Sequence, residues 1–190
     1  MTTPAQAQAL ACHLLHDPLP RRWAHTQGVA TRAAAIAPAL THHPDPLIAA
    51  AWLHDIGYTP AIASGGTGFH PLDGARYLRD TTHVDPMVCR LVAHHSCALD
   101  GAAELGLADD LAREFPLPPE DLADLLTYCD MTTSPDGQPV PVELRLAEIC
   151  TRYGPGHTVT RAITKSAARI TMTVHHVSDR LAGRDADAAR

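Results

Sequence analysis

Prolines divide the chain into segments rich in alanine and leucine, and this pattern restricts it to a helical fold. In the segment after Pro20, Val29, Ala33, Ile36 and Leu40 repeat at steps of three and four residues. This is the spacing of a single buried face on a helix. Hydrophobic residues make up 45% of the chain but aromatic residues only 4%, so the core should be aliphatic. The pattern predicts an all-α fold.

Proline and glycine positions set the expected ends of these helices. The expected helices cover residues 4–16, 20–40, 46–55, 71–80, 86–95, 120–131, 142–153 and 159–181. Asp45 is the expected N-cap of the third helix, with Pro46 at its first position and Gly57 as its C-terminal glycine. Residues 59–69 are expected to form a flexible loop, and residues 97–119 to form short pieces broken by glycine and proline.

Composition limits the classes of function. A net charge of −6 argues against a general nucleic-acid-binding surface, although a bound metal would still allow a phosphate substrate. The five cysteines are scattered and form no C-x-x-C pair, which indicates reduced thiols in a cytosol. Without a signal-peptide pattern or an apolar run of about 20 residues, we expect a soluble cytoplasmic protein that does not bind membranes.

Histidine and aspartate residues recur along the helical segments in an order that suits metal binding. The series comprises His25, His54, Asp55, His70, His94, His95 and Asp130. Imidazole favours zinc, iron, nickel or copper, and carboxylate widens the choice toward manganese and magnesium. Neighbours on a helix point about 100° apart, so His54 and Asp55 reach one metal only near a helix end. The His54-Asp55 pair alone more often has a structural role.

The full series resembles the HD-domain phosphohydrolase superfamily. The resemblance runs from Arg22 to Asp130 and rests on the order H…HD…D, with Gly57 after the His-Asp pair. It implies a compact multi-helix bundle with a metal site in the helical core. It also implies that His25, His54, Asp55 and Asp130 bind a primary metal.

Further histidines of the series match the second-metal positions of dinuclear members of the superfamily. These are His70 and the His94-His95 pair. The pair is similar to a segment of the symmetrical diadenosine-tetraphosphate hydrolases, against which His95 aligns slightly better. It is also similar to the cyclic dinucleotide phosphodiesterases, in some of which both histidines bind metal. Tyr58 stands where both subfamilies commonly carry lysine, and the sequence after Asp130 departs from the first of them, so the substrate is not assigned.

We therefore expect one HD domain over residues 1–190, with a motif core at 20–135 and a C-terminal helical extension at 142–190. Its expected activity is metal-dependent hydrolysis of a small phosphorylated substrate, such as a nucleotide, with one or two divalent ions (Mn, Fe, Zn, Ni, Co or Mg). Asp55, Arg22 and His94 are the expected catalytic residues: Asp55 orients the nucleophile, and Arg22 and His94 stabilise phosphate charge. His157 and Arg161 follow a Gly-Pro-Gly break, and a place at the site opening is the less favoured interpretation for them.

Two alternatives remain at this point. One is a regulatory module that binds metal or nucleotide without catalysis, and the other is a di-iron oxygenase of the same fold. The sequence also leaves open whether the chain forms a homo-oligomer.

Overall fold

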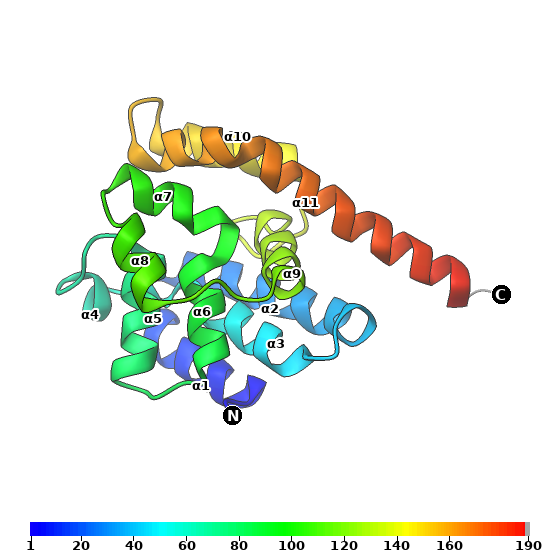
Figure 1. Ribbon diagram of the computed structural model, residues 1–190, viewed down its shortest axis with the longest axis horizontal. Helices are drawn as coiled ribbons and strands as arrows, with labels where there is room; N and C mark the ends of the chain where they lie inside the picture. The colour runs from blue at the N-terminus through cyan, green and yellow to red at the C-terminus, as the bar shows by residue number, and fades with distance from the viewer. Residues whose placement is uncertain (189–190) are drawn as a thin grey trace.

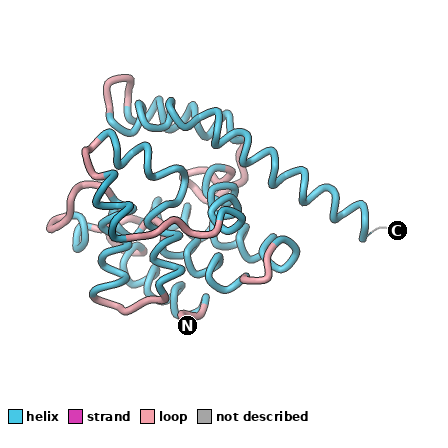
Figure 2. The backbone as a smooth tube through the Cα atoms, in the orientation of Figure 1, coloured by secondary structure: helices cyan, strands magenta, loops and turns pink. Residues whose placement is uncertain are grey.

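The computed structural model describes residues 1–188, and within this range every regular element is helical (Figures 1 and 2). The helices are α1 Pro4–Leu15, α2 Pro20–Leu40, α3 Pro44–Leu53, α4 Pro60–Ala63, α5 His70–Asp80, α6 Pro86–His94, α7 Ala98–Glu104, α8 Ala108–Glu114, α9 Glu120–Met131, α10 Val142–Tyr153 and α11 Thr158–Ala188, with short 3₁₀-helices at η1 Ile56–Tyr58 and η2 His95–Cys97. The only β-type pairing in the described range is one bridge between Thr133 and Pro139. The expectation of an all-α fold is confirmed.

The helices form a bundle that is covered on one side by the two last helices. Helix α3 packs against α1, α2 and α6, and α9 contacts α2 and α3. Helices α10 and α11 lie across the top of the view in Figure 1, where α11 contacts α7 and α9 and then projects beyond the bundle. None of the described helices combines the length and the apolar character needed to cross a membrane.

Several helix ends differ from the sequence-based expectation. Helix α3 starts at Pro44 rather than Pro46, so Asp45 lies in its first turn, where a carboxylate interacts favourably with the helix dipole. It ends at Leu53, and the chain continues into η1 instead of reaching Asp55 as a helix. The expected loop at 59–69 contains the short helix α4, and the last helix extends to Ala188 rather than 181.

Gly57 has a different role from the helix C-cap predicted for it. It lies inside η1, four residues after α3 ends. A Cβ atom at this position would lie 2.0 Å from the carbonyl oxygen of His70 and 2.9 Å from the amide nitrogen of Gly74. Only glycine permits this approach of two backbones. The glycine of the His-Asp-x-Gly motif therefore allows the first turn of α5, with His70, to pack against the turn that carries Asp55.

A second close approach fixes the loop after α9. A Cβ atom on Gly28 in α2 would lie 2.4 Å from the carbonyl oxygen of Gly137, and Gly137 itself has a positive φ of 78°. The pair of glycines lets residues 134–137 lie directly on α2. The loop thereby places the carbonyl of Ser134 beside His25.

Helix α11 is held against α7 by a half-buried carboxylate, Asp100. Asp100 accepts a hydrogen bond of 2.6 Å from the Ser166 hydroxyl, and its oxygens lie 3.2 Å from Lys165 Nζ and 2.5 Å from Arg169 Nη2. This contact holds the first turns of α11 over the site described next.

Candidate metal centre

Six of the predicted ligands converge in the centre of the bundle, although they come from five different places in the chain. His25 lies in α2, His54 and Asp55 directly follow α3, His70 begins α5, His95 begins η2 and Asp130 lies near the end of α9. They form two groups in which the candidate ligand atoms all lie within 4.8 Å of one another. The groups are His25, His54 and Asp130, and Asp55, His70 and His95.

The first group lies deep in the bundle, and all three of its side chains are buried. Nε2 of His25 lies 3.0 Å from Oδ1 of Asp130, and Nε2 of His54 lies 4.0 Å from the same oxygen. On the far side of each ring, Nδ1 of His25 donates to the Ser134 carbonyl (3.0 Å) and Nδ1 of His54 donates to the Ala51 carbonyl (2.9 Å). These bonds orient the rings and turn both Nε2 atoms toward the group, as metal ligation requires.

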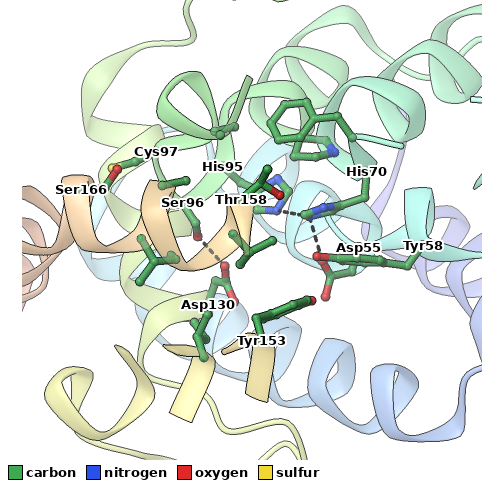
Figure 3. A pocket seen from close by; sticks show the side chains of 18 of the residues that line it. Asp55, Tyr58, His70, His95, Ser96, Cys97, Asp130, Tyr153, Thr158 and Ser166 are labelled. Atoms are coloured by element: carbon green, nitrogen blue, oxygen red, sulfur yellow. Dashed lines mark hydrogen bonds and ion pairs between the residues drawn. The ribbon is translucent and has the colours of Figure 1, made fainter. Parts of the chain in front are cut away.

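The second group borders the open cavity (Figure 3). Nε2 of His70 lies 3.2 Å from Nε2 of His95 and 3.4 Å from Oδ1 of Asp55. Nδ1 of His95 donates to the Val92 carbonyl at 2.7 Å, so its Nε2 also faces inward. Both groups therefore use the same device, a backbone carbonyl that fixes the tautomer of the histidine.

Asp55 lies between the two groups and presents one oxygen to each. Its Oδ2 is 3.3 Å from Nε2 of His54, whereas its Oδ1 faces His70. The same Oδ2 accepts a hydrogen bond of 2.7 Å from Nη1 of Arg22, whose guanidinium also stacks at 4.0 Å on the ring of Tyr58. A carboxylate in this position is suited to bridge two ions.

The residues present fit a divalent metal. Nε2 of His54 is fully buried and has no hydrogen-bond partner among the described residues. A buried nitrogen without a partner costs free energy unless something binds it. The donor set of four imidazoles and two carboxylates suits zinc, iron, manganese, nickel or cobalt.

Electrostatics keeps most of these groups in the protonation state that binds metal. Burial tends to raise the pKa of Asp55, but the charges of Arg22 and His54 hold it well below its usual range. Burial likewise opposes ionisation of Asp130, and the hydrogen bond from His25 together with the charge of His54 outweighs it and lowers its pKa.

The pKa values of the histidines shift in two directions. Burial lowers the pKa of His70 and of His95, so both rings are neutral near pH 7. Burial also acts to lower the pKa of His54, but the carboxylates of Asp55 and Asp130 raise it to about 8. A cation bound to the first group would displace this proton.

His94 is not brought to either group. It ends α6, and its Nε2 lies 2.7 Å from the Phe115 carbonyl on the side of the helix away from the ligands. The adjacent position His95 begins η2, where the backbone leaves the helical conformation with φ −61° and ψ 150°. We therefore retain His95 and not His94 as the proposed ligand, and nothing in the position of His94 supports a catalytic role.

The turn after His95 brings in Ser96, which the sequence analysis did not select. Ser96 and Cys97 have positive φ values of 49° and 61°, a region that residues with a side chain rarely adopt. In this conformation the Ser96 hydroxyl donates to Oδ2 of Asp130 (Figure 3). The strained turn thus orients Asp130, a candidate ligand on α9.

The cavity beside the second group has a volume of about 350 Å³. Its lining includes Asp55, His70 and Asp130, together with Tyr153 from the end of α10 and Thr158 from the start of α11 (Figure 3). The lining also contains a set of apolar side chains: Met131, Ile149, Val159, Ala162 and Ile163.

Some residues of this cavity were not predicted from the sequence, and for others a place at the site was the less favoured interpretation. His157 does line the cavity, whereas Arg161 instead pairs with Glu104 at 2.7 Å. Arg145 and Arg152, seven residues apart on α10, both line the cavity. Their spacing places them on one helix face, which was the available signal.

Comparison with known proteins agrees with this geometry. The family model described as HD domain matches residues 22–153, well over half of the chain. The protein therefore belongs to the HD-domain family, whose members bind divalent metals and are mostly metal-dependent hydrolases. No curated protein and no solved structure gave a significant match.

Proposed function

We propose that the protein is a metal-dependent phosphohydrolase that cleaves a phosphate ester or anhydride of a small molecule, with a nucleotide as the preferred class. The observation that carries this proposal is the position of Asp55. One of its oxygens faces His54 and the other faces His70, so a single carboxylate connects two complete groups of candidate ligands. Paired sites of this kind are typical of enzymes that transfer phosphoryl groups to water.

In this proposal His25, His54 and Asp130 would hold one ion, His70 and His95 would hold a second, and Asp55 would serve both. Bound ions of this kind supply a water of lowered pKa and a Lewis acid for a phosphoryl oxygen. Asp55 accepts a hydrogen bond from the attacking water and keeps it oriented toward the cavity.

Arg22 and Tyr58 provide donors for the phosphoryl group. Arg22 lies against Asp55 and also lines the cavity, where its planar guanidinium can donate two hydrogen bonds to phosphate oxygens. Burial, followed by the charge of Asp55, raises the pKa of Tyr58 well above its usual range. The phenol therefore stays protonated and remains a donor at neutral pH.

The apolar side chains in the cavity lining support an organic substrate rather than inorganic phosphate alone. Ile149, Val159 and Ile163 face the cavity within reach of an apolar group attached to the phosphate. Mixed apolar and polar walls of this size are typical of sites for small molecules. A nucleoside is the substrate group that fits this combination best.

Phosphate release from a panel of nucleotides tests the proposal. His95→Asn removes a proposed ligand and is expected to reduce kcat/KM by at least about a hundredfold. His94→Asn is the matched control, because the neighbouring histidine is similarly buried but faces Phe115, and it should retain activity. Metal binding without phosphate release would favour a regulatory module, and oxygen-dependent turnover with iron would favour a di-iron oxygenase.

A further inference from the structure

A second cavity, of about 290 Å³, lies beside the metal centre and is lined by four arginines. Arg21 and Arg22 come from the start of α2, and Arg145 and Arg152 come from α10. We call this cavity the arginine pocket. The other described residues that line it are Pro18, Leu19, Pro20, His25 and Pro135, so no carboxylate is among them.

Arg145 is the most unusual member of the pocket. Its side chain is only 4% exposed, and Nη1 pairs with Glu148 at 2.6 Å. Its Nε is buried and has no hydrogen-bond partner among the described residues. A buried donor on a charged group is costly when unpaired, so this nitrogen indicates that an acceptor belongs here.

Carboxylates near the pocket do not balance its positive charge. Asp136 pairs with Arg21 at 2.8 Å, and Glu148 is shared between Arg145 and Arg152, the latter at 3.4 Å. Three guanidinium groups therefore share two carboxylates, while Arg22 is paired with Asp55. A positive pocket in a chain with a net charge of −6 is a localised site for an anion.

The arginine pocket shares three lining residues with the cavity of the metal centre. Arg22, Arg145 and Arg152 line both. The same three arginines therefore border both the cavity beside Asp55 and the arginine pocket, so a substrate bound at Asp55 lies close to a second anion site.

We propose that the arginine pocket binds a second phosphoryl group of the substrate, so that the substrate class is compounds with at least two phosphoryl groups, such as nucleoside diphosphates or triphosphates. This inference rests on the proposed function, which places the group to be cleaved at Asp55. The arginines act in binding: Arg21, Arg145 and Arg152 donate to oxygens of the phosphoryl group that is not attacked, and Arg22 donates to the group beside Asp55.

Binding of two phosphonates to the full chain with its metals in place tests the inference. Methylenediphosphonate carries two phosphoryl groups and resists hydrolysis, and methylphosphonate carries one. By isothermal titration calorimetry, the unaltered protein should bind methylenediphosphonate at least about tenfold more tightly. Arg145→Gln, Arg152→Gln and Arg21→Gln should each weaken this preference. Arg113→Gln is the control, because Arg113 pairs with Asp110 on the exposed face of α8.

The outcomes separate this inference from the proposed function. If Arg21→Gln and Arg152→Gln both keep the full preference for methylenediphosphonate, the inference is overturned even where phosphate release continues. These two side chains are more exposed than Arg145, so they test the pocket even if Arg145→Gln fails to fold. If the arginine variants lose the preference but no nucleotide is hydrolysed, the pocket stands and the proposed function fails.

Discussion

Gly57→Ala should damage both the fold and the second metal group, because a single backbone contact serves both. The new Cβ atom would lie 2.0 Å from the His70 carbonyl oxygen and 2.8 Å from its carbonyl carbon, whereas ordinary van der Waals contact begins at 3.4 Å. Both partners are backbone, so the turn of Asp55 and the start of α5 must separate by more than an ångström. Overpacking of this kind costs about 1–3 kcal/mol, and contact with rigid backbone places the cost near about 3 kcal/mol.

Urea denaturation measures this loss of unfolding free energy, and elemental analysis of the same protein measures metal content. Since His70 moves with the start of α5, we expect the variant to lose metal from the second group as well as stability. Gly65→Ala is the matched control, because a Cβ atom there meets nothing within 4 Å. If Gly57→Ala and Gly65→Ala have the same stability and the same metal content, the close-approach argument is wrong.

Two further predictions concern the elements that support the site. Ser96→Ala removes the donor to Oδ2 of Asp130 and should weaken metal binding to the first group about tenfold, since residues that orient ligands contribute on this scale. A metal titration measures this affinity, with exposed Ser64→Ala as the control. Equal affinities of the two variants would contradict the role of Ser96. Asp100→Asn should cost about 1 kcal/mol at pH 7, an amount limited by the exposure of Lys165 and Arg169. Burial opposes ionisation of Asp100, but Ser166 and Lys165 lower its pKa, so its contribution is present above the unfolded pKa and declines as the pH falls below about 3.8. Urea melts at pH 7 and at about pH 3, with exposed Asp109→Asn as control, should show the difference shrinking at the lower pH; a difference that grows would refute it.

The helices bounded by proline or glycine residues were predictable from the sequence. A proline precedes α9 and another precedes α10, and both helices cover their predicted ranges, 120–131 and 142–153. The start of α3 was wrong because two prolines, Pro44 and Pro46, both suit a first turn. The predicted end of α11 was wrong because Gly183, the glycine nearest to residue 181, lies inside the helix and does not end it.

The site was predictable in its members but not in its geometry. Six of the seven predicted ligands come together, yet the choice between His94 and His95 depends on the place where α6 gives way to η2. That change involves positive φ values at Ser96 and Cys97, which neither residue type signals. The arginines of α10 were missed because they reach the centre only through the packing of the C-terminal helices on the bundle.

Metal content of three purified proteins tests the central claim most directly. The unaltered chain should contain about two ions, His70→Ala should contain about one, and His94→Ala should contain about two. The account predicts these ratios because His70 belongs to the second group alone and His94 belongs to neither. An unchanged metal content in His70→Ala, or a loss of metal in His94→Ala, would contradict it.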